Sequence, residues 1–214
     1  MFKQTLSIAL IAAALTTQIQ ADTFNVTITN MTVGQVLTPP VIITHDKSVK
    51  LFTPGQPAPS FLIPLAEGGH TDAFKDIDKS FSIISDVVLA TGPVKPGKSL
   101  TMTVQTTTSH PYISVAGMLA STNDSFAAIN SHKLDFNADT QMMTAAVYDA
   151  GTEFNSEKCE FIPGPPCGND GVRDTEKAEG YVYISNGVHG IGDLPAATFT
   201  WLNPAIRVVI SRTK

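Results

Sequence analysis

Two acidic turns in this 214-residue sequence hold the side chains best suited to bind a metal ion. Asn123 and Asp124 follow the apolar run YISVAGML, and Asp149 and Glu153 follow MTAAVY. Calcium takes about six to eight oxygen ligands from carboxylates, amides, backbone carbonyls and water, and neighbouring loops of a β-sandwich can supply them. Clustered carboxylates would also repel one another, which a divalent cation relieves. The alternative is that Asp124 and Asp149 only form Asx turns that end the two strands.

The two cysteines, Cys159 and Cys167, lie eight positions apart in a proline-rich loop, CEFIPGPPC. In an oxidising compartment such a pair is most simply a disulfide. A blue-copper centre would need a free thiolate with a histidine and a methionine close behind it. The next histidine is His189, and no methionine follows either cysteine. We therefore predict a disulfide that closes the loop, and no copper site.

The local motifs of common enzyme classes are absent from the sequence. The five histidines include no His-x-x-x-His pair, and neither a Gly-x-Ser-x-Gly elbow nor a Walker phosphate loop occurs. We therefore predict that the protein is not an enzyme. The alternative is a hydrolase that uses His189, in NGVHGIGD, with a hydroxyl and a carboxylate, because triad members meet in space rather than in sequence. The simpler interpretation makes His189 a turn residue.

The N-terminal residues predict export. MFKQTLSIALIAAALTTQIQA combines Lys3, an apolar run over residues 6–15 and a polar stretch that ends at Ala21. The apolar run is too short to span a bilayer, which takes ~20 residues, and is typical of a secretory signal peptide. We therefore predict a signal peptide over residues 1–21, a single mature domain over residues 22–214, and a periplasmic or extracellular location.

The charge composition bears on the class of partner. The formal net charge is −5 and only 15% of the residues are charged. Nucleic-acid binding uses a clustered basic face, so we expect no nucleic-acid partner. No run after the signal peptide is apolar for long enough to cross a membrane. The expected partner is an unidentified protein or another component of the cell surface.

Alternation of apolar and polar residues predicts an all-β fold. TFNVTITNMTV and LTMTVQTTT alternate as half-buried strands do, and YVYIS, ATFTW and IRVVISR add shorter β-branched or aromatic runs. VIIT, YISVAGML and MTAAVY are apolar enough to be strands buried on both faces. Turn clusters rich in Gly and Pro separate these runs at a spacing typical of a sandwich. We therefore predict an antiparallel β-sandwich.

One segment, LAEGGHTDAFKDIDKSFSIISDVV over residues 65–88, has mixed periodicity. Thr71, followed by Asp72 and Ala73, would make an N-cap. We predict a short helical insertion here rather than a second domain, because the segment is too short to form its own core.

Six segments occur in an order that resembles the spondin N-terminal domain, the module found in F-spondin and mindin of animals and in short exported bacterial proteins. The resemblance covers residues 24–212, and YDAGTE and the C-terminal tryptophan block are its most specific parts. The segments are GQVLTPPVIITHD, LAEGG, TNDSF, YDAGTE, PGPPC and WLNPAIRVVISR.

This resemblance implies a C2-like sandwich with a calcium ion held among loops at one end. The aspartate of the TND turn corresponds to Asp124 and that of the YDAG turn to Asp149, both expected ligands. The animal proteins also use an acidic residue on the preceding strand, where LTMTVQTTT puts Thr103, so Glu153 or Asn123 would have to compensate. Those proteins act in adhesion, which implies a non-enzymatic domain that mediates interaction or adhesion. The remaining alternative, a metal-free envelope domain, predicts that Asp124 and Asp149 lie far apart.

Overall fold

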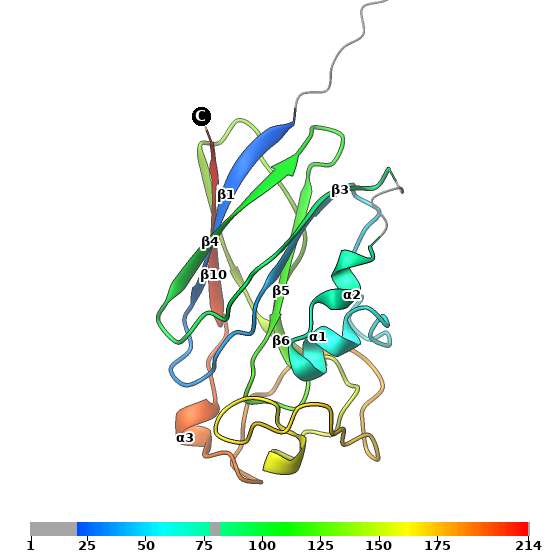
Figure 1. The fold of residues 1–214 in the computed structure, drawn as a ribbon, viewed down its shortest axis with the longest axis vertical. Coiled ribbons are helices and arrows are strands. Elements are labelled where there is room, and N and C mark those ends of the chain that lie inside the picture. The colour runs from blue at the N-terminus through cyan, green and yellow to red at the C-terminus, as the bar shows by residue number, and fades with distance from the viewer. Residues whose placement is uncertain (1–20, 78–81, 214) are drawn as a thin grey trace, which may run out of the picture.

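The computed structural model describes residues 21–77 and 82–213, and these form two antiparallel β-sheets packed face to face (Figure 1). The predicted all-β sandwich is thereby confirmed. The predicted signal peptide, residues 1–21, lies outside the described residues except for its last position. Within the two described ranges, none of the helices has the length and apolar character needed to cross a membrane.

The first sheet has four strands, and its inner face forms half of the core. Phe24, Val26 and Ile28 alternate with polar residues and are fully buried, because only one face of this sheet packs against the rest of the protein. In order across the sheet, the strands are β4 (Ser99–Thr106), β1 (Asp22–Asn30), β10 (Ile206–Arg212) and β7 (Thr140–Ala145).

The second sheet has six strands and packs on both faces. One face meets the first sheet, and the other packs against α1 (Ile63–Gly68) and α2 (Asp72–Lys75) through Leu65 and Phe74 (Figure 1). The runs VIIT and YISVAGML are buried on both faces, as predicted. In order across the sheet, the strands are β3 (Ile84–Leu89), β2 (Val41–His45), β5 (Tyr112–Met118), β6 (Ser125–Lys133), β8 (Val147–Asp149) and β9 (Tyr183–Ile184).

The helical insertion predicted over residues 65–88 is present but ends earlier than expected. It contains α1 and α2, and Thr71 is the N-cap residue of α2, although its side chain makes no capping hydrogen bond. Residues 84–88 belong to β3, which pairs with β2. Residues 78–81 lie outside the described part of the chain.

Two predicted strands need correction. ATFTW was expected to be a strand, but it holds most of the short helix α3 (Ala196–Phe199). Pro195 begins this turn, since proline cannot donate to a sheet and its carbonyl accepts the helical hydrogen bonds. MTAAVY was expected to be one strand buried on both faces, but it divides between β7, an edge strand with alternate side chains exposed, and β8. The chain crosses between the sheets at Ala146.

Candidate functional site

The turns that hold Asp124 and Asp149 lie side by side at one end of the six-stranded sheet. Asp124 precedes β6 and Asp149 ends β8, and the antiparallel register of these neighbouring strands puts Ser125 opposite Asp149. The two aspartates are therefore one residue apart across the sheet. Both side chains are buried. The large separation that a metal-free domain predicted is not found.

The Asp124 carboxylate orders the turn that follows β8 with one of its two oxygens. Oδ2 accepts hydrogen bonds from the backbone amides of Thr152 at 2.7 Å and Glu153 at 3.0 Å, and from the Thr152 hydroxyl at 3.2 Å. Oδ1 is buried and has no hydrogen-bond partner in the structure. A buried carboxylate oxygen without a donor is costly, and the hydrogen bonds to Oδ2 fix the position of Oδ1.

The Asp149 carboxylate closes its own turn. Oδ1 accepts a 2.8 Å hydrogen bond from the Gly151 amide, and Oδ2 accepts one of 2.7 Å from the Asn155 amide group. Gly151 has φ of +65°, and a Cβ there would lie 2.2 Å from the Tyr181 carbonyl oxygen. The glycine of YDAG is therefore required by backbone conformation and by close packing.

Glu179 and Tyr183 complete this acidic group, and sequence reasoning missed both. Tyr183 lies opposite Asp149 in the register of β8 with β9, and its hydroxyl accepts a 3.1 Å hydrogen bond from Asn155. Oε2 of Glu179 is buried without a hydrogen-bond partner. The one sequence signal that could have found them is the YVYIS run, because a strand that pairs with the YDAG strand brings its neighbours to the same turn.

Electrostatics show how poorly the protein itself compensates these charges. Burial, and next the charge of Asp149, hold the pKa of Asp124 well above its usual range. Burial raises the pKa of Asp149 to about 6, with a further rise from Glu179, although the hydrogen bonds from Asn155 and Gly151 oppose this. The charged forms therefore lack a counter-charge, which a bound cation would supply.

The other two predicted ligands, Asn123 and Glu153, have different neighbours. Asn123 Oδ1 accepts a 3.3 Å hydrogen bond from the Glu157 amide, and its Nδ2 makes no hydrogen bond. Burial, and next the charge of Glu67, raise the pKa of Glu153 to about 8, while the charge of Arg173 lowers it. The Glu153 carboxylate thus belongs with residues of α1 and of the 170–174 segment, and its backbone amide is what contacts Asp124.

Thr103 does not occupy the position that the resemblance gave it. The strand that directly precedes the Asp124 turn is β5, whereas Thr103 lies on β4 of the other sheet. Its exposed side chain donates a 2.9 Å hydrogen bond to Asn25. Thr103 therefore lies on the four-stranded sheet and not on the strand that leads into the Asp124 turn.

The oxygen atoms of this site suit a calcium ion, but the side chains alone do not complete a coordination shell. Across the described residues, no three acidic, histidine or cysteine side chains stand in a ligating arrangement. The available oxygens are Asp124 Oδ1 and Glu179 Oε2, with Asp149 beside them. Calcium accepts flexible geometry and fills its shell with carbonyl oxygens and water, so oxygen ligands from two or three carboxylates suit it.

His189 lies on a half-exposed turn and is anchored through its backbone. The amides of His189, Gly190 and Ile191 donate hydrogen bonds of 2.5, 2.7 and 2.9 Å to the buried Glu157 carboxylate. The imidazole Nδ1 lies 3.5 Å from Glu157 Oε1. Within the described residues, no Ser or Thr hydroxyl and no Asp carboxylate makes a hydrogen bond with the imidazole.

The predicted disulfide between Cys159 and Cys167 is confirmed. It closes the loop that begins at the short helix η1 (Cys159–Phe161) and packs on a small cluster formed by Ile162, Val188 and Leu194. The bridge therefore closes one loop, which packs against the His189 segment through Val188 and Leu194.

No protein-family description and no curated protein matches this chain.

Proposed function

We propose that this chain is an exported, non-enzymatic β-sandwich of the spondin N-terminal type. In this proposal it binds one calcium ion and presents the loops ordered by that ion to a protein partner, at the cell surface or in the envelope. The observation that carries the proposal is the pair of adjacent buried aspartates, one of which keeps Oδ1 without a hydrogen bond. The disulfide suits a protein that folds in an oxidising compartment.

Calcium would act here as an ordering ion. Asp124 and Asp149 would be its carboxylate ligands, with Glu179 in reach of the same charge group. Neutralising these groups offsets the cost of burying their charges, which is the main cause of their raised pKa values, and the smaller repulsion between them. It also fixes the turn after β8 against the turn before β6. The partner would contact the ordered loops. No reaction is required, which agrees with the absence of the common catalytic motifs from the sequence.

Isothermal titration calorimetry on the folded mature chain tests this proposal. We expect one calcium ion per chain, with a Kd of ~0.1 to 1 mM, as in other extracellular calcium modules. The Asp124→Asn variant should lose at least about tenfold in affinity, whereas Asp139→Asn, at an exposed loop position, should not differ from the native chain. Titrations without saturable heat at millimolar calcium would contradict the proposal.

A further inference from the structure

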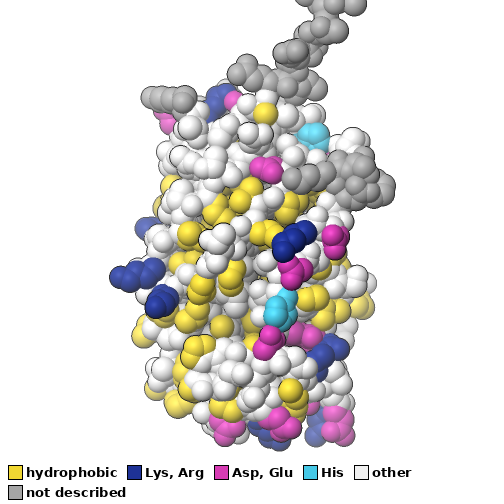
Figure 2. Space-filling model, in the orientation of Figure 1, with side chains coloured by type: hydrophobic (Ala, Val, Ile, Leu, Met, Phe, Trp, Pro, Cys, Tyr) yellow, Lys and Arg dark blue, Asp and Glu magenta, His cyan; other side chains and the backbone are white. Residues whose placement is uncertain are grey.

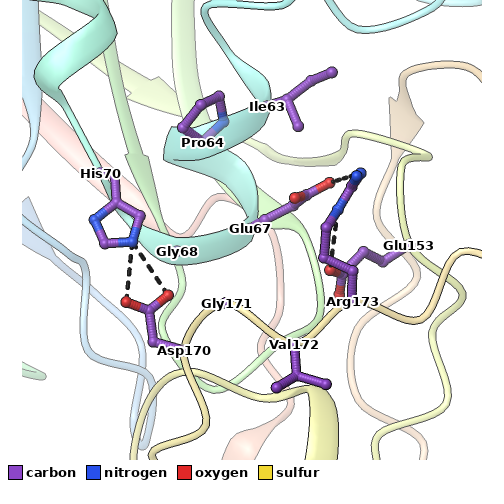
Figure 3. A pocket seen from close by; sticks show the side chains of 10 residues that line it. All are labelled: Ile63, Pro64, Glu67, Gly68, His70, Glu153, Asp170, Gly171, Val172 and Arg173. Atoms are coloured by element: carbon purple, nitrogen blue, oxygen red, sulfur yellow. Dashed lines mark hydrogen bonds and ion pairs between the residues drawn. The ribbon is translucent and has the colours of Figure 1, made fainter.

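We propose that the cavity between α1 and residues 170–173 binds an alkylammonium group, from a lysine side chain or from a free alkylamine. The cavity has a volume of about 210 Å³, which is below the range of ordinary small-molecule pockets and suits one short chain. Ile63 and Pro64 lie on one side of it and Val172 on the other (Figure 3). This proposal does not depend on calcium binding by Asp124 and Asp149.

Charge complementarity is the first argument for a cation. Glu67, Glu153 and Asp170 line the cavity, and Arg173 is the one permanently charged cation among the lining residues described. Figure 2 shows acidic side chains and a histidine gathered over the part of the surface that holds α1. His70 Nε2 lies 3.0 Å from Asp170 Oδ2, and both side chains are about half-exposed. The cavity therefore holds three carboxyl groups against one guanidinium and one imidazole, so it has more acidic groups than cationic ones.

The second argument is an unpartnered carboxylate oxygen. Glu153 is 1% exposed, and its Oε2 has no hydrogen-bond partner. Figure 3 shows its side chain directed toward Arg173, but Arg173 Nε lies 3.9 Å from Glu153 Oε1, beyond hydrogen-bond reach. The Arg173 guanidinium bonds Glu67 instead, at 2.5 Å. Glu153 therefore lacks a donor that a buried carboxylate needs.

An alkylammonium group supplies what is missing. It carries three N–H donors around one charge, which reach carboxylates in several directions, and its methylene stem packs on Ile63, Pro64 and Val172. Arg173 is half-exposed, so its guanidinium can turn toward solvent and leave Glu153 to the incoming ammonium. Arg173 therefore competes with the ligand for the carboxyl groups of Glu67 and Glu153.

An NMR titration of the ¹⁵N-labelled mature chain tests this proposal. The probes are n-butylammonium and Nα-acetyl-lysine methylamide, each in excess EDTA and in saturating calcium, with n-butanol as the uncharged control. We expect saturable shifts at residues 63–70 and 170–173, at millimolar ligand, in both buffers. Glu67→Gln and Glu153→Gln should each weaken binding about tenfold, because each removes a carboxyl group that would pair as a carboxylate with the bound ammonium. Arg173→Met should tighten binding about threefold, because the competing guanidinium is gone.

The relative affinity of the two probes identifies the source of the amine. Tighter binding of the lysine derivative supports a lysine side chain of a protein partner, and tighter binding of n-butylammonium supports a free amine. Equal shifts with n-butanol would overturn the proposal, as would loss of binding in Arg173→Met or displacement of the amine by calcium. Glu67→Gln alters a side chain that is 13% exposed, and the glutamine oxygen can still accept the Arg173 hydrogen bond, so its result stands even if Glu153→Gln fails to fold. If calcium does not bind at Asp124, the amine titrations in EDTA still test this proposal.

Discussion

The backbone amide of Glu153 donates a 3.0 Å hydrogen bond to Oδ2 of Asp124. This bond, with its companion from Thr152, joins the turn after β8 to the turn before β6. The other oxygen of Asp124 stays free of hydrogen bonds. The two oxygens of this carboxylate therefore have different functions in the proposed calcium site. Oδ2 holds the two turns together, and Oδ1 is available to the ion.

The Asp124→Asn variant should keep the function of Oδ2 and lose that of Oδ1. The asparagine carbonyl can still accept the Thr152 and Glu153 amides, while the substitution removes a buried charge next to Asp149. We expect the calcium-free variant to be at least as stable as the native chain, by up to about 2 kcal/mol, but to gain nothing from calcium. Urea unfolding followed by circular dichroism, in EDTA and in calcium, measures both. A variant that is still stabilised by calcium as much as the native chain would count against Asp124 as a ligand.

The stability of the calcium-free protein should fall as the pH rises. Burial raises the pKa of Asp149 from 3.8 to about 6, so the folded chain binds a proton more tightly than the unfolded chain does. The free energy of unfolding should therefore decrease between about pH 4 and pH 6, by at most about 3 kcal/mol from this group. Calcium should reverse the trend, because it competes with the proton for the carboxylates.

Urea midpoints from pH 4.5 to 7.5, compared between the native chain and Asp149→Asn, isolate this contribution. The comparison is needed because burial also lowers the pKa of His45. This histidine makes the free energy of unfolding decrease as the pH drops below about 6.5, which is opposite to the effect of Asp149. If the difference between the two chains in EDTA does not change with pH, the buried carboxylate is not the cause.

Glu157→Gln should destabilise the protein although it keeps the shape of the side chain. The buried carboxylate accepts three backbone amides of the His189 loop, and an amide group would face one of them with a donor of its own. We expect a loss of about 2 kcal/mol and faster proteolysis between residues 186 and 192. His189→Ala is the matched control, since it keeps the backbone donors, and should change stability by less than about 0.5 kcal/mol. Equal losses in both variants would mean that the imidazole, not the backbone, holds the loop.

Removing the disulfide should cost stability without affecting calcium. Cys159 and Cys167 close a loop with a sequence separation of 8, for which chain entropy gives about 2 to 3 kcal/mol. In the double variant Cys159→Ser, Cys167→Ser, the melting temperature should fall, while the increase caused by calcium stays the same. Differential scanning calorimetry measures both values. Loss of the calcium effect would show that the bridge positions the ligands.

Sequence patterns predicted the strands that show either a clear alternation, as β1 does, or a β-branched apolar run, as β2 and β5 do. Alternation marks β1 clearly because Phe24, Val26 and Ile28 are buried while Asn25, Thr27 and Thr29 lie on the opposite face. β6 was missed, since the residues at its N-terminal end are buried on both faces and SFAAINSHK carries no alternation. α3 was taken for a strand because its residues favour strands, whereas the Pro195 turn decides the outcome.

The candidate site was predictable only where its residues follow long apolar runs. Asp124 and Asp149 could be selected on that ground. Glu179 and Tyr183 could not, because they reach the site through β9, a strand of two residues whose place depends on pairing with β8. The direction of the Glu153 side chain toward α1 is likewise a tertiary property, set by Glu67 and Arg173 from distant parts of the chain.

Thermal unfolding with and without calcium tests the central claim most directly. At about 10 mM calcium and a Kd of ~0.5 mM, a ligand that binds only the folded chain adds about 2 kcal/mol. For a domain of this size that raises the melting temperature by about 4 to 8 °C relative to EDTA, with no rise in Asp124→Asn. Equal melting temperatures of the native chain in calcium and in EDTA would contradict the account.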